Sequence, residues 1–271
     1  MCFARRSVNA PVDSSPVTSH QPAARRVPAA VLWDMDGTLV DTEPIWQRSQ
    51  VELTARYDAP WTHEDGMSLV GSGLERSGEI LRERGVAMSV EDIVEWMTSY
   101  VVERMAARVP WRPGARELVE ELHDRGIPTA LVTMSRRRMA LVTAGAIGAR
   151  GFRVVVAGDD VEHAKPHPEA YRTAAAALGV DPRHCIAIED SPTGVTSAAA
   201  SGAVTVGVEH VVSLSGAAGD VHLSSLEGVD VDGLLELAAP GFAARAAGSA
   251  AARAGGALPS DTALAAQDTG R

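Results

Sequence analysis

The sequence predicts an α/β fold: a doubly wound, Rossmann-like parallel sheet forms the core, and a helical cap domain is inserted into it. Short apolar runs alternate with amphipathic helical patterns along most of the chain, which is typical of βα units around a parallel sheet. Residues 43–109 break this alternation, because they contain several helical patterns and no convincing strand. An insert after the first strand lies above the carboxyl ends of the strands, where such sheets bind ligands.

Five apolar runs are predicted to form the strands of the core. They are short and rich in aliphatic residues, as buried strands are. In chain order these runs are 29–33, 128–133, 153–157, 185–189 and 203–208. Helical patterns between them occupy residues 114–125, 168–178 and 192–201. Each of these helices is followed by a glycine suited to end it, namely Gly126, Gly179 and Gly202.

The insert carries its own helix-start signals. Thr42 is expected to cap its first helix, which has Pro44 in the first turn. Ser89 and Asp92 form a variant of the capping box at the start of a later helix. The chain therefore divides into a core of residues 29–42 and 110–237 and a helical cap of residues 43–109.

The two ends of the chain differ in composition from the predicted domains. Residues 1–28 are rich in Pro, Ser and Ala and contain no apolar signal-peptide core, so a disordered leader is expected. Residues 238–271 are rich in Ala and Gly and are expected to form a disordered tail.

Bulk composition limits the partners and the location of the protein. A formal net charge of −10 argues against nucleic acid or an anionic membrane as partner. The two cysteines, Cys2 and Cys185, cannot build a disulfide framework, which favours a reducing compartment. No run of apolar residues is long enough to cross a bilayer. We expect a cytoplasmic monomer, and we expect its histidines, which lack zinc-ligand spacing, to be surface residues.

Acidic residues follow two of the predicted strands. Asp34 and Asp36 end the first strand, and Gly37 lets the backbone turn away sharply. Glu189 and Asp190 end the fourth. If these strands are parallel neighbours, four carboxylates meet at one sheet edge, and their repulsion is tolerable only with cations present. Such hard oxygen ligands suit Mg²⁺.

Two more strand ends carry complementary groups. Thr133 ends the second strand and offers a hydroxyl, and Lys165 follows the third. Of the 25 basic residues 24 are arginine, so Lys165 is the sole lysine. Its compact ammonium fits beside a small anion better than a guanidinium does. Each group alone is an ordinary strand-end residue, but together they indicate one site.

Residues 34–37, Thr133, Lys165 and the pair 189–190 resemble, in order, the four motifs of the haloacid dehalogenase-like hydrolase superfamily. The resemblance is to the branch with a helical cap after the first motif, which includes β-phosphoglucomutase. It covers nearly all of residues 29–237, including residues 111–114 at the return from the cap.

The resemblance implies a Mg²⁺-dependent phosphatase that acts on a small phosphorylated metabolite, such as a sugar or polyol phosphate. Asp34 is then the nucleophile that becomes an aspartyl-phosphate. Asp36 is the general acid for the leaving alcohol and later the base for water. Thr133 binds the phosphoryl group, and Lys165 neutralises Asp34 and a phosphoryl oxygen.

The implied metal ligands are Asp34, the backbone carbonyl of Asp36 and Asp190, with Glu189 binding directly or through water. Three further residues are candidate substrate contacts: Ser135, Glu43 and Arg76. Glu43 lies at the hinge into the cap, where stabilisation of a helix N-terminus by its charge is a slightly favoured alternative role.

Other activities of the superfamily fit less well. A dehalogenase lacks the second acid that Asp36 provides, and a phosphonoacetaldehyde hydrolase needs a cap lysine that is absent here. A β-phosphoglucomutase-like phosphosugar mutase is the main alternative, although its cap histidine and phosphate-binding arginine fall on Trp46 and Leu74. Arg76 lies nearby as a substitute.

A non-enzyme alternative is a signalling receiver domain that accepts a phosphoryl group. Such domains also combine an acidic pair, a Thr or Ser and a Lys on a doubly wound sheet. They are about half as long as this chain, however, and have no helical insert.

Overall fold

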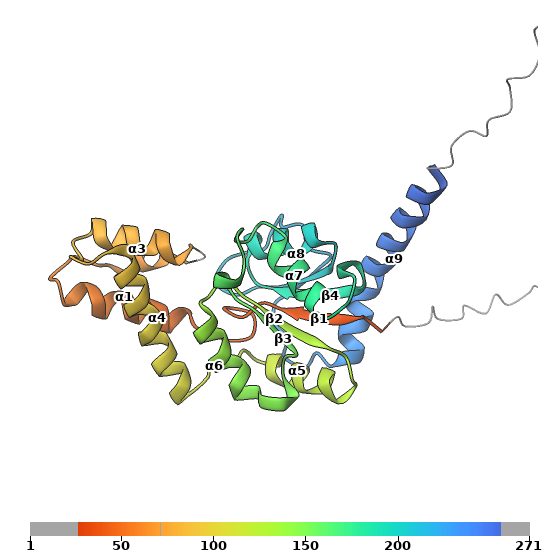
Figure 1. Ribbon diagram of the computed structural model, residues 1–271, viewed down its shortest axis with the longest axis horizontal. Helices are drawn as coiled ribbons and strands as arrows, with labels where there is room; N and C mark the ends of the chain where they lie inside the picture. Colours follow the sequence, from red (N-terminus) through yellow and green to blue (C-terminus); the bar gives the residue numbers. More distant parts are fainter. Residues whose placement is uncertain (1–26, 71, 256–271) are drawn as a thin grey trace, which may run out of the picture.

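The computed structural model of the protein describes residues 27–70 and 72–255. Six parallel strands form one sheet at its centre (Figure 1). The strands are β1 (Ala30–Trp33), β2 (Thr129–Val132), β3 (Val154–Val156), β4 (Cys185–Glu189), β5 (Val204–Val208) and β6 (Val221–Leu223). Their order is β3-β2-β1-β4-β5-β6, so the chain adds strands on one side of β1 and then on the other, and the topological switch point lies between β1 and β4. The predicted doubly wound α/β fold is confirmed, and such sheets bind ligands at this switch point.

The five predicted strands all occur, with ends within two residues of those expected. The sixth strand, β6, was missed in the sequence. It is three residues long, half-exposed at the sheet edge, and contains the polar His222. A short edge strand buries little surface and so leaves no apolar run to detect.

Helices cover both faces of the sheet. In β1, Val31 and Trp33 contact the cluster that includes α5 (Ala115–Asp124), α6 (Arg137–Ile147) and α9 (Val231–Gly255). Ala30 and Leu32 point the opposite way, as alternate strand residues must, toward α7 (Glu169–Ala177) and α8 (Pro192–Ser201). Figure 1 shows α7 and α8 on one side of the sheet and α5 and α6 on the other.

The insert after β1 consists of helices. These are α1 (Glu43–Ala55), α2 (His63–Met67), α3 (Leu74–Glu83) and α4 (Val90–Ala107), at the left of Figure 1. The described residues between 43 and 107 form no strand. They enclose a small apolar core of their own, formed by Leu53, Leu81, Val86, Ile93 and Met97.

The two connections between the insert and the rest of the chain lie side by side. The amide of Asp41 donates to the carbonyl of Pro110 at 2.8 Å, and the amide of Arg112 donates to the carbonyl of Leu39 at 2.8 Å. Farther out, Arg136, the residue before α6, forms an ion pair of 2.9 Å with Glu75 of α3, and Arg138 of α6 forms one of 2.7 Å with Glu95 of α4. The insert is therefore held against the carboxyl end of the sheet by a two-stranded junction and by these two ion pairs.

The predicted cap of α1 is wrong. Thr42 occupies the N-cap position, but its side chain makes no capping hydrogen bond. Its hydroxyl donates instead to Oδ1 of Asp36 at 2.6 Å. A charged acceptor makes a stronger hydrogen bond than a neutral partner, so the carboxylate outcompetes the helix end. The cap predicted at Ser89 is present, because its hydroxyl accepts the amide of Asp92 at 3.0 Å.

The disordered tail expected from residue 238 is wrong up to residue 255, where the chain continues as α9. Alanine favours helix, and the helix has somewhere to pack: Ala238 is buried and Phe242 contacts the core. Arg245 forms a fork with Asp220, at 2.8 Å from each guanidinium nitrogen to a carboxylate oxygen. The rest of that tail and residues 1–26 of the expected leader lie outside the described residues.

No helix in the described part of the chain combines the length and the apolar character needed to cross a membrane.

Replacement of Arg245 by Ala is expected to destabilise the protein. The guanidinium binds Asp220 and also donates to the carbonyl of Gly202 at 2.8 Å, in a half-buried position. Loss of hydrogen bonds to a charged group should lower the free energy of unfolding by about 1.5–3 kcal/mol, measured by urea denaturation. The control Arg48→Ala removes an exposed helix pair with Glu52 and should change it by less than about 0.5 kcal/mol. Equal effects of the two would contradict a structural role for α9.

Candidate active site

A cleft of about 280 Å³ lies between the carboxyl end of the sheet and the insert. One side is lined by residues from the predicted motifs, including Asp34, Asp36, Thr133, Lys165 and Asp190. The insert lines the opposite side with Trp46, Gln50, Leu69, Ser77 and Met97. Side chains from four separate stretches of the sequence thus meet in one place, because parallel neighbouring strands end at the same edge.

Lys165 lies at the floor of the cleft and has three partners. Its Nζ donates to Oδ1 of Asp34 at 2.6 Å, to Oε1 of Glu189 at 2.7 Å and to the backbone carbonyl of Val132 at 3.0 Å. Only 6% of its side chain is exposed. An ammonium has three N–H donors, so this setting satisfies all of them.

Burial and charge shift the acidities of these groups. Burial raises the pKa of the Asp34 carboxyl to about 7; the charge of Glu189 adds to the rise, while Lys165 opposes it. Burial, with the charge of Asp34, also raises the pKa of Asp190. Burial acts to lower the pKa of Lys165, but Asp34 and Glu189 outweigh it and hold that pKa above its ordinary value. The side chain of Lys165 therefore stays positively charged, but its single charge does not balance the carboxylates around it.

Tyr171 is a buried partner of this group that the sequence analysis missed. Its hydroxyl donates to Oε1 of Glu189 at 2.6 Å, and Nζ of Lys165 lies 5.0 Å from its ring centre. Burial and the charge of Glu189 raise the pKa of the phenol, so it remains a donor. Its place in α7, six residues after Lys165, was the only signal in the sequence.

Glu189 is fully buried and both of its oxygens are engaged. Oε2 accepts the amide of Asp190 at 3.2 Å and the hydroxyl of Ser191 at 3.3 Å. Gly194 of α8 makes room for this carboxylate, since a Cβ there would lie 1.9 Å from Oε2. Glu189 therefore acts in the site chiefly through its charge and the hydrogen bonds that it anchors.

Gly37 makes room for the carboxylate of Asp190, as Gly194 does for that of Glu189. Its φ of +88° is in the left-handed region, and a Cβ would lie 2.0 Å from Oδ2 of Asp190. The glycine thus lets the loop after β1 pass close to the carboxylate that ends β4. The expected sharp turn at Gly37 is present.

Asp36 is held by three hydroxyl groups. Oδ1 accepts from Thr42 at 2.6 Å, and Oδ2 accepts from Ser135 at 2.7 Å and Thr133 at 3.2 Å. Thr133 and Ser135 are thus in the site, where in this structure both donate to Asp36, and their expected substrate contacts remain predictions.

Glu43 and Arg76, the two candidate substrate contacts that belong to the insert, differ in their positions. Glu43 lines the cleft, and burial raises the pKa of its carboxyl even though Gln47 donates to it at 3.3 Å. This position favours a role in the site over the helix-end role. Arg76 is not among the described residues that line the cleft; it is 59% exposed and pairs with Glu79. We therefore do not retain Arg76 as a substrate contact.

Two further polar residues in the cleft were not predicted. His210, expected at the surface, has only 11% of its side chain exposed, and its Nε2 lies 3.3 Å from Asp41. Burial, with the charge of Arg112, lowers the pKa of this imidazole. Gln50 of α1 is buried, and its Oε1 has no hydrogen-bond partner within the described residues.

The carboxylates can hold a hard cation. Oxygens of Asp34, Glu189 and Asp190 lie within 4.8 Å of one another. Oδ2 of Asp34 is buried and has no partner in the part of the chain that the structure describes. A buried polar atom without a partner is costly, and here three carboxylates face one ammonium. This donor set matches the oxygen ligands that Mg²⁺ takes.

Replacement of Tyr171 by Phe should weaken the buried network. It removes the donor at 2.6 Å from Glu189 and leaves a charged oxygen with one partner fewer. We expect the free energy of unfolding to fall by about 1–3 kcal/mol in urea denaturation. Tyr57→Phe is the matched control at a residue that is 37% exposed, and should be neutral. If the two variants were equally stable, Tyr171 would not support Glu189.

Known proteins with similar sequences include phosphatases of phosphorylated carbohydrates and hexitols. Hexitol phosphatase B of Escherichia coli is 27% identical over 176 residues, which is 64% of this chain and 79% of that protein. A phosphorylated carbohydrates phosphatase of Thermotoga maritima is 32% identical over 187 residues, 67% of this chain and 85% of the relative.

Proteins of known structure also resemble this chain in fold. The crystal structure of CbbY from Rhodobacter sphaeroides in complex with phosphate superposes with a TM-score of 0.69 at 29% identity, covering 77% of this chain and 99% of CbbY. Residues 28–202, well over half of the sequence, match the family of hydrolases described as haloacid dehalogenase-like. That stretch includes β1, the insert and every residue of the acidic group around Lys165. The chain is a member of the haloacid dehalogenase-like hydrolase family.

Proposed function

We propose that the protein is a Mg²⁺-dependent phosphatase that hydrolyses a small sugar or polyol phosphate through an aspartyl-phosphate. The observation that carries this proposal is the buried contact of 2.6 Å between Asp34 and Lys165 at the floor of the cleft. It leaves the second oxygen of Asp34 without a partner among the described residues. Hydrolase family membership and similarity to hexitol and carbohydrate phosphatases support the assignment.

In the first step an oxygen of Asp34 attacks phosphorus, and the bond between phosphorus and the alcohol oxygen breaks. Lys165 holds Asp34 in place and faces the phosphoryl oxygens with its positive charge. Protonated Asp36 gives its proton to the leaving alcohol. Phosphoryl transfer depends mainly on such positioning and charge stabilisation.

In the second step Asp36 acts as the base. Its carboxylate takes a proton from water, the water oxygen attacks phosphorus, and the bond to Asp34 breaks to release inorganic phosphate. Hydroxyls of Thr42, Thr133 and Ser135 hold Asp36 for this exchange. One side chain thus serves as acid and base in turn.

Asp34, the backbone carbonyl of Asp36 and Asp190 would hold the Mg²⁺. The cation would supply charge stabilisation for the phosphoryl group. Glu189 contributes negative charge to this site and positions Lys165, since both of its oxygens already accept hydrogen bonds.

The insert acts as the cap, comprising residues 43–109, over a core of residues 29–42 and 110–237 extended by α9. Its side of the cleft combines apolar Trp46, Leu69 and Met97 with the amide of Gln50. Trp46 occupies the place where a phosphoglucomutase-like mutase would have a histidine, so a simple phosphatase is preferred over the mutase. Gln50 offers a hydrogen bond to a substrate hydroxyl.

Replacement of Asp34 by Asn should abolish hydrolysis of p-nitrophenyl phosphate. An amide cannot form the aspartyl-phosphate, so kcat should fall at least about 1,000-fold, measured by release of p-nitrophenol. The amide oxygen can still accept from Lys165, so the fold should persist. EDTA should suppress the wild-type rate, and added Mg²⁺ should restore it.

The matched control is Asp159→Asn, which changes a carboxylate outside the cleft and should keep wild-type activity. Full activity of Asp34→Asn, or wild-type turnover in EDTA, would refute the mechanism.

Replacement of Gln50 by Leu should separate two kinds of substrate. For a hexitol phosphate, loss of one hydrogen bond should reduce kcat/KM about 10-fold. For p-nitrophenyl phosphate, which has no hydroxyl to bind, kcat/KM should stay within about twofold of wild type. Arg48→Leu, at an exposed residue of the same helix outside the cleft lining, is the control. An equal loss for both substrates would show that Gln50 does not contact the substrate.

A further inference from the structure

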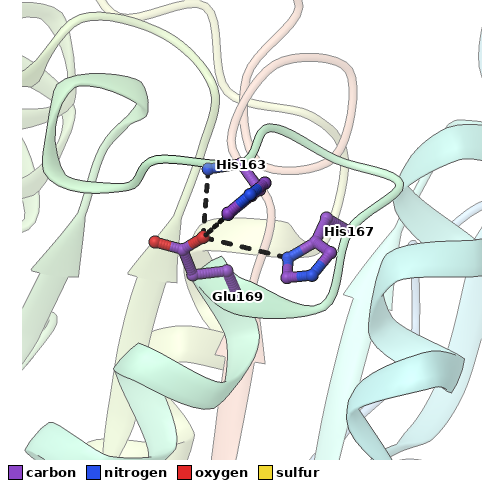
Figure 2. A group of neighbouring side chains, drawn as sticks. All are labelled: His163, His167 and Glu169. Carbon is purple, nitrogen blue, oxygen red and sulfur yellow. Dashed lines mark hydrogen bonds and ion pairs between the residues drawn. The ribbon is translucent and has the colours of Figure 1, made fainter.

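A second group of metal-ligating side chains lies on the loop that carries Lys165. Figure 2 shows His163 and His167 of this loop with Glu169, the first residue of α7. Their ligand atoms all lie within 4.8 Å of one another. Both histidines are at the surface, as expected; they are separated by four positions, and an acid follows two residues after the second.

Both imidazoles approach the same carboxylate oxygen. Nδ1 of His163 is 2.7 Å from Oε2 of Glu169, and Nδ1 of His167 is 3.8 Å from it. Ligands about 2.1 Å from a tetrahedral zinc are roughly 3.4 Å apart. The two distances lie on either side of that value, so small side-chain movements bring all three ligands to a metal. The rings are exposed enough to make such movements, at 60% and 49%.

Glu169 is held in place by the backbone of the loop. Oε1 accepts the amide of Glu162 at 2.8 Å, and Oε2 accepts the amide of His163 at 3.0 Å. The hydrogen bond from Glu162, followed by the contact with His163, holds the pKa of this carboxyl below its usual range. The acid is therefore ionised and oriented before any metal arrives, as a ligand must be.

A simple ion pair accounts for only part of this arrangement. His163 has a hydrogen-bonding partner in Glu169, so it needs no metal. His167, at 3.8 Å, is too far from Glu169 for a hydrogen bond. Yet its ring turns toward the same oxygen, and its centre is 4.5 Å from that of His163 (Figure 2).

We propose that His163, His167 and Glu169 bind a divalent transition metal of the zinc type, at a site separate from the carboxylates around Asp34. Imidazole nitrogen with one carboxylate suits zinc, whereas Mg²⁺ prefers oxygen ligands alone. Three protein ligands leave a fourth coordination position open to water or to another small ligand.

The position of the site links it to Lys165. His163 lies two residues before this lysine and His167 two residues after it. A metal bound to both histidines joins the two ends of the segment whose middle residue holds Asp34. Occupation of the site therefore stiffens the loop that presents the ammonium, without touching the ammonium itself.

The test is a calorimetric titration of the full chain with Zn²⁺ in the presence of excess Mg²⁺. We expect one Zn²⁺ per chain in wild type. His167→Ala should weaken binding by about 10-fold or more, since the loss of even an outer partner of a metal ligand has effects of this size. The side chain of His167 holds no hydrogen bond to Glu169, so this variant should keep the thermal midpoint of metal-free wild type.

Two controls separate this site from others. His123→Ala removes an exposed histidine of α5 and should bind Zn²⁺ like wild type. Asp34→Asn should also bind it like wild type, which makes the result independent of the phosphatase proposal. Zn²⁺ should raise the thermal midpoint of wild type and of both controls, and should raise that of His167→Ala less.

Two results would overturn the proposal. One is an absence of binding tighter than about 1 mM in wild type, which corresponds to a free energy of only about −4 kcal/mol. The other is unchanged affinity in His167→Ala, which would mean that Zn²⁺ binds elsewhere on the chain.

Discussion

The buried ammonium of Lys165 is the interaction on which the rest of the site depends. It compensates Asp34 and Glu189 in a place where water cannot screen their charges. Isolated carboxylates there would be expensive, and removal of one member of a buried pair is strongly destabilising. Tyr171, the amide of Asp190 and the hydroxyl of Ser191 also donate to Glu189, so a network of hydrogen bonds holds these charged groups in place.

The topology of the sheet creates this constraint. Because β1 and β4 are parallel neighbours, Trp33 pairs with Ile188, and the residues that follow each strand emerge side by side. Asp34 and the pair 189–190 are thus forced together. The same edge receives the insert, whose two connecting segments are hydrogen-bonded to each other near Val40 and Trp111. The positions of the carboxylates, the cleft and the insert therefore all depend on the pairing of β1 with β4.

Local patterns predicted much of the fold. Apolar runs marked five of the six strands, and glycines marked the ends of the helices between them. Two local predictions were wrong for a common reason. The hydroxyl of Thr42 donates to Asp36 and so does not cap α1. Helix α9 continues past residue 238 because Arg245 binds Asp220 and Phe242 packs against the core. In both cases a distant partner outweighs what neighbouring residues would dictate.

The sequence by itself determined the fold class, the family and the residue types at the strand ends, because these depend on periodicity and on motifs of a few residues. Only the tertiary structure decided which partner each group takes. In the structure Tyr171 donates to Glu189, three hydroxyls donate to Asp36, and Arg76 lies outside the cleft lining. Hydrogen-bond partners far apart in sequence leave no local pattern, since side-chain direction is set by packing after the chain has folded.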